Sequence, residues 1–175
     1  MANILIFYST TDGHTRRICQ QLQTVIEQQS HRVTLLPIEE WPHTDLSGFA
    51  KIVVGASIRY GKHSALVVDF GDKNKSLLDS KANAFFTVNV VARKPEKNRP
   101  DTNPYMLKFL TKTSWKPKQL AVFAGKIDYQ KYDFIDRMVI RFIMWLTKGP
   151  TNTDGVFEFT DWQQVDDFGR TISRM

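Results

Sequence analysis

Five short runs of apolar residues constrain the fold of this 175-residue chain more than any other feature of its sequence. They lie at residues 4–8, 32–36, 52–55, 84–88 and 120–124 and are rich in Val, Ile, Leu and Phe. A strand with one face in water alternates apolar with polar residues, whereas a strand covered on both faces reads as a continuous apolar run. We therefore expect five parallel strands buried between two layers of helices.

Longer segments of helical character separate these runs, at residues 14–29, 63–79, 104–113 and 161–173. In the first of them Ile18, Leu22, Val25 and Ile26 share one helix face, which predicts that this face packs on the sheet. Strands that alternate with helices in this way predict an α/β fold with a doubly wound sheet.

The sequence contains no internal repeat and no low-complexity linker, so we expect a single domain over residues 1–175. Two segments look inserted. Residues 92–101 are charged and contain two prolines, and residues 126–155 separate the fifth run from another β-like run at 156–159.

The net charge of +6 comes from one part of the chain, because residues 91–120 hold eight Lys or Arg against two acids. A positive field spread over the whole surface favours nonspecific binding to polyanions. A local patch favours one local anionic target, and we expect no nucleic-acid partner.

Cys19 is the only cysteine, which excludes an intramolecular disulfide and any multi-cysteine metal site. We expect it to be a small buried apolar residue in the first helix of a protein from a reducing compartment. The histidines lack ligand spacing, so no metal site is predicted.

No apolar run approaches the ~18 residues of a spanning helix, and the N-terminus lacks a secretory leader, so we expect no membrane span.

The loop after the first strand, residues 9–15, combines hydroxyl groups, a glycine and a helix start. In open parallel sheets ligands bind beyond the carboxyl ends of the strands. Backbone N–H groups at this helix start could hold a phosphate, or Thr11 or Asp12 could simply cap the helix. The sequence matches neither a nucleoside-triphosphate loop nor a Gly-x-Gly-x-x-Gly fingerprint.

Two further loops carry groups suited to a planar ligand. After the third strand, Arg59 and Tyr60 lie between two glycines, where Tyr60 could stack on a ring or cover the sheet edge. After the fourth strand, Asn89 offers an amide for hydrogen bonding and a dense run of cations follows.

Taken together, these motifs resemble known flavoproteins. Residues 10–15, Thr-Thr-Asp-Gly-His-Thr, resemble the FMN-phosphate loop of flavodoxins. Residues 55–61, 88–97 and 160–162 are similar to the quinone-dependent protoporphyrinogen IX dehydrogenases of bacterial haem biosynthesis. The resemblance covers nearly the whole chain and implies a flavodoxin-like sheet of order 2-1-3-4-5, with a helical insertion that splits the fifth strand.

The resemblance implies an oxidoreductase that uses FMN to oxidise protoporphyrinogen IX to protoporphyrin IX and passes the electrons to a membrane quinone. It assigns the FMN phosphate to Ser9, Thr10, Thr11, Asp12, Gly13, His14 and Thr15. It assigns the flavin ring to Ser57, Ile58, Arg59, Tyr60, Gly61, Thr87, Val88, Asn89, Val90, Val91, Ala92, Arg93, Lys94 and Gly125. It identifies no catalytic acid or base.

The chain departs from the flavodoxin pattern in two ways. Asp12 and His14 stand where flavodoxins usually have threonine and asparagine, and we expect the Asp12 carboxylate to face away from the phosphate and cap the helix. The chain is also basic, whereas flavodoxin electron carriers are acidic, which favours an enzyme. The alternatives are an FMN electron carrier, or a module that binds a tetrapyrrole or a membrane without flavin.

The substrate of such an enzyme has two propionates. Arg93, Lys94, Lys97 and Arg99 could pair with them, or with anionic lipid. Residues 131–148 are more apolar than a helix on one sheet face needs, so they either add to the core or lie in the membrane interface. The second alternative predicts a peripheral protein on the cytoplasmic side of the inner membrane. The sequence does not predict the oligomeric state.

Overall fold

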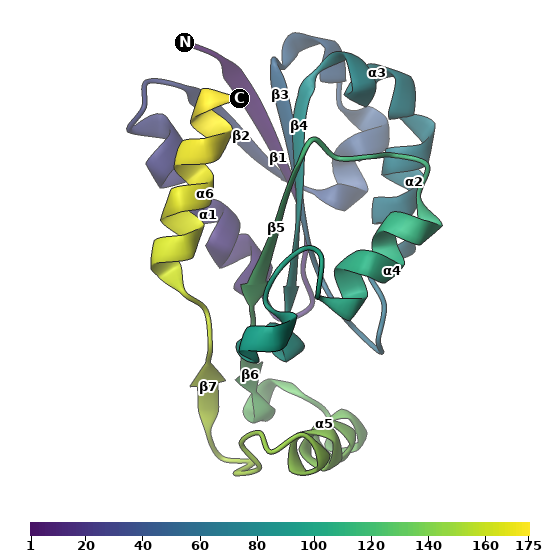
Figure 1. The fold of residues 1–175 in the computed structure, drawn as a ribbon, viewed down its shortest axis with the longest axis vertical. Coiled ribbons are helices and arrows are strands. Elements are labelled where there is room, and N and C mark those ends of the chain that lie inside the picture. Colours follow the sequence, from purple (N-terminus) through teal and green to yellow (C-terminus); the bar gives the residue numbers. More distant parts are fainter.

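A computed structural model describes residues 1–175 and contains a five-stranded parallel sheet of order β2-β1-β3-β4-β5 (Figure 1). The strands are β1 (Asn3–Ser9), β2 (Arg32–Pro37), β3 (Lys51–Ser57), β4 (Ala82–Asn89) and β5 (Gln119–Ala124). Each coincides with one of the five apolar runs. The predicted fold class is therefore confirmed.

Helices cover both faces of the sheet (Figure 1). Helices α1 (His14–Glu27) and α6 (Trp162–Arg174) lie side by side on one face, and α2 (Ala65–Lys73), α3 (Lys75–Ser80) and α4 (Pro104–Lys112) lie on the other. The buried face of α1 contains Ile18, Leu22 and Ile26, as the spacing predicted, and Cys19 is buried beside them. The opposite layer is built on the aromatic residues Phe70, Phe85, Phe109 and Trp115.

The segment 63–79 forms two helices rather than the single one expected. At Asn74, between α2 and α3, the backbone dihedrals are φ −108° and ψ 13°, outside helical values. The Asn74 side-chain amide donates to the carbonyl oxygen of Phe70 at 2.9 Å. An asparagine side chain that bonds locally to the backbone competes with helix continuation, which accounts for the break.

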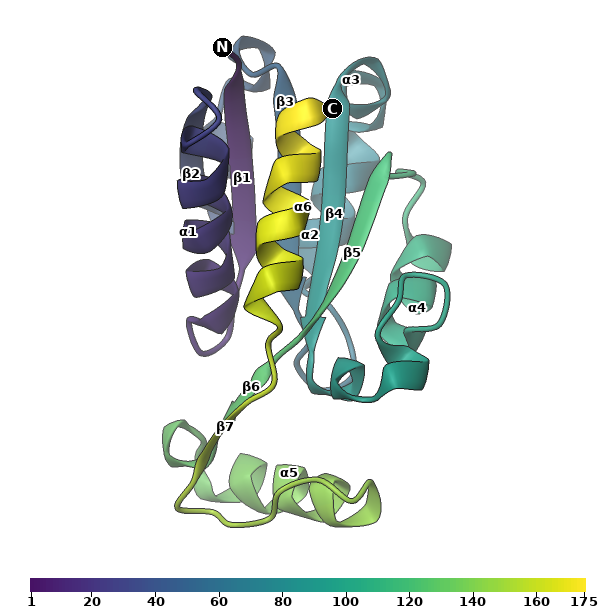
Figure 2. The same cartoon turned by 60° about the vertical axis from the view of Figure 1, so that its left-hand side comes forward.

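The insertion differs in one respect from the expected split of the fifth strand. Strand β5 is complete in the main sheet, and β6 (Lys126–Asp128) continues beyond Gly125 to pair in antiparallel fashion with β7 (Val156–Glu158). This ribbon holds α5 (Phe134–Leu146) beyond the carboxyl ends of the main strands (Figure 2). Five 3₁₀ turns complete the fold: η1 (Ile38–His43), η2 (Leu46–Gly48), η3 (Val90–Arg93), η4 (Pro95–Lys97) and η5 (Tyr129–Lys131).

Helix α5 does not add to the core of the sheet. Among its residues only Met144 is buried, against Ile127 and Tyr129 of the ribbon. Its other large apolar side chains are 45–75% exposed, except the partly buried Ile140. The alternative in which the insertion packs inward is therefore wrong for most of α5. No helix of the structure is long and apolar enough to span a bilayer.

Candidate functional site

The loops predicted to bind a ligand meet at one edge of the sheet. Strands β1, β3, β4 and β5 are neighbours and run parallel, so the loops that follow them share the carboxyl edge. The strand order reverses direction between β1 and β3, which is where ligands bind in sheets of this kind.

The loop after β1 is shaped by Gly13, which has φ 91° and forms the N-terminal boundary of α1. The Gly13 N–H donates to Thr10 Oγ1 at 2.9 Å, and the His14 N–H donates to Asp12 Oδ1 at 3.1 Å. The Asp12 carboxylate therefore caps the first N–H of α1, and this part of the expectation is confirmed. A side chain at Gly13 would be strained, because positive φ is unfavourable for other residues.

Several groups beside this loop lack partners within the protein. Thr15 Oγ1 is buried and makes no hydrogen bond. The backbone N–H groups of Thr15 and Arg16 also have no acceptor, and the first turn of α1 contains no acidic residue. A helix start with unpartnered donors favours an anion. The loop therefore fits a phosphate monoester.

The imidazole of His14 has a different role from the predicted contact with phosphate. Its Nε2 lies 2.7 Å from Thr160 Oγ1, and that hydroxyl donates to the carbonyl oxygen of Ala124 at 2.7 Å. Nε2 must therefore be the donor, and burial lowers the pKa of His14, so the ring is neutral at neutral pH. His14 anchors the phosphate loop to the segment before α6 and supplies no positive charge to a phosphate.

The loop after β3 turns sharply at Tyr60 and Gly61, whose φ angles are 51° and 74°. Arg59 and Lys62 exchange two backbone hydrogen bonds across this turn. The Tyr60 side chain is 71% exposed, so the alternative in which it covers the sheet edge is wrong. This loop contacts the loop after β1 through Ser57 Oγ, which donates to the Ser9 carbonyl oxygen at 3.4 Å.

Helix α5 contacts this loop through Asp136, a residue that the sequence analysis did not select. Tyr60 donates its hydroxyl to Asp136 Oδ1 at 2.7 Å, and Arg59 Nη2 donates to Oδ2 at 3.1 Å. Asp136 lies on the insertion, far along the chain from Tyr60, and no motif links the two. The insertion also approaches the phosphate loop, because Lys131 Nζ donates to the Asp12 carbonyl at 3.4 Å.

Tyr132 is a second residue of the insertion that sequence reasoning missed. Burial, and next the negative charge of Asp12, raise the pKa of Tyr132 to about 12. A phenol next to the phosphate loop thus stays protonated at neutral pH. Tyr132 lies in the inserted segment and outside the predicted loops, so no sequence pattern pointed to it as a site residue.

The Asn89 side chain holds the loop after β4 in place through hydrogen bonds. Its Oδ1 accepts from the Ala92 N–H at 3.1 Å, and its amide exchanges hydrogen bonds with the side chain of Asn103. Thr87 is buried and bonded to His63 Nε2 at 2.8 Å. Asn89 and Thr87 therefore hold the loop in place, and their polar atoms are used within the protein rather than being free for a ring.

The predicted substrate cations differ in their contacts within the protein. Arg93 Nη2 donates to the carbonyl and hydroxyl oxygens of Thr147, at 3.1 and 3.0 Å, so this guanidinium holds the end of α5 instead of facing a ligand. Arg99 pairs with Asp101 at 3.4 Å. Lys94 and Lys97 are half-buried, and their ammonium groups make no hydrogen bond within the protein.

The other residues that were predicted to border the flavin ring lie at the carboxyl edge of the sheet, where some are buried and some half-buried. Val88 and Ala92 are buried, Ile58, Val90 and Val91 are half-buried, and the Gly125 N–H donates to the carbonyl oxygen of Asn89 at 3.1 Å. The structure thus brings the loops after β1, β3, β4 and β5 together and adds the insertion to them.

Comparison with known proteins gives two sets of similar chains. Residues 5–154 match the family model of the flavodoxin domain. Protoporphyrinogen IX dehydrogenase (quinone) of Escherichia coli strain K12 is 37% identical over 171 residues, covering 98% of this chain and 94% of the relative. The protein of the same name from Leishmania major is 39% identical over 172 residues, covering 98% of this chain and 74% of the relative.

Among solved structures, flavodoxins have the same fold. Oxidised flavodoxin 2 from Bacillus cereus gives a TM-score of 0.59 at 15% identity and covers 99% of both chains. Two-electron reduced flavodoxin from Megasphaera elsdenii gives a TM-score of 0.58 at 11% identity, covering 98% of this chain and 99% of the flavodoxin.

Proposed function

The chain belongs to the flavodoxin domain family and, within it, to the protoporphyrinogen IX dehydrogenases (quinone); on that premise we propose that it oxidises protoporphyrinogen IX with FMN and passes the electrons to a quinone. The observation that carries the proposal is the loop after β1. Its unpartnered Thr15 hydroxyl and helix-start amides fit the phosphate of FMN, at the reversal point of the sheet.

The residues around this loop have distinct tasks. Thr10, Thr11 and Gly13 belong to the loop that would hold the phosphate, and the unpartnered Thr15 hydroxyl would donate to it. Ser9 borders the loop at the end of β1. Asp12 and His14 hold the loop in shape through their contacts within the protein.

The ring of the flavin would lie between the loops after β3 and β4. Ser57, Ile58, Tyr60, Gly61, Val90, Val91 and Gly125 are the residues that can border it. FMN supplies the electron-transfer chemistry when bound. For every two electrons and two protons that leave the substrate, one quinone becomes one quinol, so the reaction balances without another reactant.

We further propose that α5 lies in the membrane interface, where a quinone is found, and that the protein is peripheral on the cytoplasmic side of the inner membrane. Eight apolar side chains of α5 form one continuous exposed face: Phe134, Ile135, Met138, Val139, Phe142, Ile143, Trp145 and Leu146. Exposed apolar faces of this extent are rare on monomeric proteins and mark contact surfaces.

The charged residues of α5 support this orientation. Asp136 is bonded to Tyr60, and Arg137 donates to the carbonyl oxygens of Tyr129 and Tyr132, so neither interrupts the apolar face. Arg141 is exposed at the border of that face, where a cation can meet an anionic headgroup. A helix with this division of side chains is typical of interfacial binding.

The enzyme proposal is tested by turnover without oxygen. FMN-loaded protein is mixed with protoporphyrinogen IX and a menaquinone analogue, and protoporphyrin formation is followed by fluorescence. We expect porphyrin to form catalytically with the quinone, and without it to stop well below one porphyrin per protein, because one FMN cannot accept all the electrons that the oxidation removes. An electron carrier would give no catalytic turnover with these two reactants, and a folded protein that stays colourless with added FMN would contradict a flavin-dependent function.

A further inference from the structure

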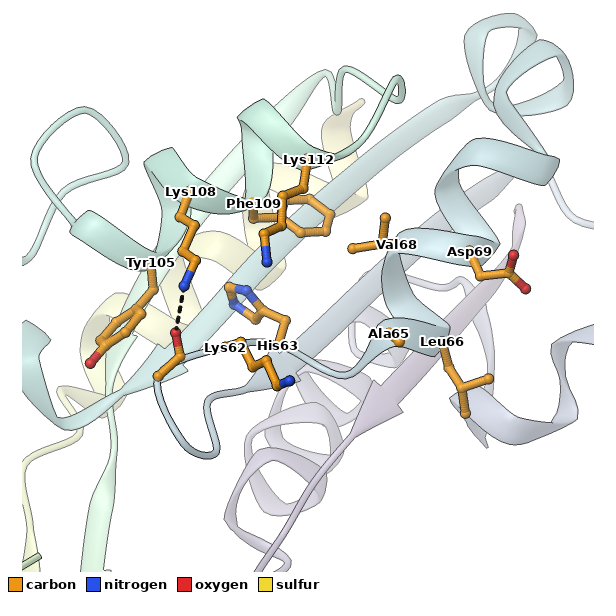
Figure 3. A pocket seen from close by; sticks show the side chains of 11 residues that line it. Lys62, His63, Ala65, Leu66, Val68, Asp69, Tyr105, Lys108, Phe109 and Lys112 are labelled. Atoms are coloured by element: carbon orange, nitrogen blue, oxygen red, sulfur yellow. Dashed lines mark hydrogen bonds between the residues drawn. The ribbon is translucent and has the colours of Figure 1, made fainter.

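A cavity of about 640 Å³ lies between α2, α4 and the loop after β3, beside the proposed flavin site (Figure 3). Its apolar wall contains Leu66, Val68 and Phe109, and three lysines surround it: Lys62, Lys108 and Lys112. Gly61 belongs both to the cavity wall and to the loop that carries Tyr60. The cavity therefore adjoins the edge where the flavin ring would lie.

The lysines of this cavity are largely free of partners. The ammonium groups of Lys62 and Lys112 make no hydrogen bond and no ion pair. Lys108 Nζ has a single contact, with the carbonyl oxygen of Gly61 at 3.3 Å (Figure 3). The one acid in the wall, Asp69, pairs with Lys73 at 3.2 Å. Positive charge in the cavity is thus uncompensated.

His63 also lines the cavity and is affected by the positive charge of these lysines. Its ring packs edge-on against Phe85 and Phe109, and its Nε2 is bonded to Thr87 Oγ1. Burial lowers the pKa of His63 to about 4, and the charges of Lys112 and Lys108 act in the same direction. An anion beside these lysines would be stabilised without having to displace an existing carboxylate.

We propose that this cavity binds the carboxylates of an amphipathic dicarboxylate. The inference rests on the proposed function, in which the ligand is protoporphyrinogen IX and the groups bound here are its propionates. The volume lies within the range of about 300–1,000 Å³ that is usual for ligand sites, and the cavity combines an apolar wall with a few charged donors, as such sites do. Ammonium–carboxylate hydrogen bonds are charge-assisted and therefore strong.

This assignment differs from the one that the sequence alone favoured. The Arg93 guanidinium is bonded to Thr147 within the protein, whereas the ammonium groups of Lys62 and Lys112 are free. Lys94 and Lys97 remain the alternative binding site for the carboxylates. Substitution of each lysine pair in turn shows which of the two sites binds them.

The test measures binding of protoporphyrin IX, a stable dicarboxylate with the same propionates, to the FMN-loaded protein by fluorescence titration. The variant K62Q/K112Q should fold normally, because the ammonium groups of Lys62 and Lys112 make no hydrogen bond in the wild-type protein. We expect its Kd for protoporphyrin IX to rise about tenfold or more. The dimethyl ester, which lacks the carboxylates, should bind wild type and variant equally.

A matched control removes two positive charges elsewhere. K75Q/R170Q changes exposed residues of α3 and α6 whose ion pairs, with Asp79 and Asp167, contribute little. Its Kd should equal that of wild type. Equal Kd values for K62Q/K112Q and wild type, with a tenfold loss in K94Q/K97Q, would overturn the proposal.

Turnover separates this proposal from the proposed function. If wild type oxidises protoporphyrinogen IX and K62Q/K112Q has an unchanged KM, the cavity does not bind the substrate although the function stands. If wild type shows no turnover but binds protoporphyrin IX in a lysine-dependent manner, the cavity site stands and the proposed function fails.

Discussion

Asp136 on α5 accepts a hydrogen bond from the hydroxyl of Tyr60 at 2.7 Å, and this contact joins the insertion to the loop after β3. Near the other end of the helix, Arg93 donates to the carbonyl oxygen of Thr147 at 3.1 Å. The two contacts hold α5 at both ends against the carboxyl edge of the sheet. The apolar face of α5 and the proposed flavin site are thereby linked.

Replacement of Asp136 with Ala should loosen α5 without unfolding the protein. The Asp136 carboxylate is only 14% exposed and accepts two hydrogen bonds, so the free energy of unfolding should fall by about 1–3 kcal/mol. Hydrogen exchange of the α5 amides should increase. Y60F keeps the Arg59 pair and should have a smaller effect. Exchange in α5 that is identical in D136A and wild type would show that the contact does not position the helix.

Replacement of Thr15 with Val should weaken FMN binding and leave the fold intact. Thr15 Oγ1 is buried without a partner, so its loss removes an unsatisfied group, and the unfolding free energy should stay equal or rise by about 1 kcal/mol. The Kd for FMN should rise about tenfold, because a donor to the phosphate is lost.

The control for this variant lies on the same helix. Thr24 Oγ1 donates to the Gln20 carbonyl on the exposed side of α1, so T24V should not change FMN affinity. A T15V protein that binds FMN as tightly as wild type would mean that Thr15 is not a phosphate ligand.

A charge on the apolar face of α5 should prevent membrane binding. Phe142 is 58% exposed on that face, and F142E should reduce flotation with anionic phospholipid vesicles at least about tenfold. Leu107 of α4 is 45% exposed elsewhere, so L107E is the matched control and should float like wild type. Unchanged flotation of F142E, or self-association of the protein through this face instead of vesicle binding, would contradict the membrane proposal.

His63 should make the protein less stable as the pH is lowered. The unfolded chain binds a proton at this side chain near pH 6.5, whereas the folded protein does so only near pH 4. The free energy of unfolding should therefore fall between these values, with a loss of about 2 kcal/mol at pH 5, and the effect should be absent above pH 7.

The H63Q variant tests this dependence by urea denaturation at pH 7 and pH 5. We expect a smaller loss of stability at pH 5 in H63Q than in wild type, with part of the loss remaining because the pKa of His14 is also lowered. H43Q, at an exposed position in η1, should behave as wild type. Equal losses in H63Q and wild type would refute the assignment to His63.

The strands could be predicted because burial on both faces leaves continuous apolar runs, and most helices because burial of one face leaves periodic apolar residues. Ile4 to Phe7 are completely buried from both faces, and their run contains no polar residue. The break at Asn74 was missed because it depends on one local side-chain bond to Phe70 rather than on periodicity. Local hydrogen bonds of this kind can override a helical pattern.

The loops of the site were predictable from the position of strand ends, whereas the direction of their side chains was not. Asn89 ends β4 and Arg93 follows it, yet their polar groups bond to Asn103 and Thr147. These partners are distant in the chain, so residue type alone could not exclude them. Likewise, Lys62 and Lys112 belong to different segments and are brought to one cavity only by the packing of α4 beside the loop after β3.

The central claim is that the loop after β1 binds a phosphate monoester and so places a flavin at the carboxyl edge of the sheet. It is tested most directly by titrating the flavin-free protein with FMN and with riboflavin, which has the same ring but no phosphate. We predict that FMN binds at least about 100-fold more tightly, since several charge-assisted hydrogen bonds depend on the phosphate. Equal affinities for the two flavins would contradict the account.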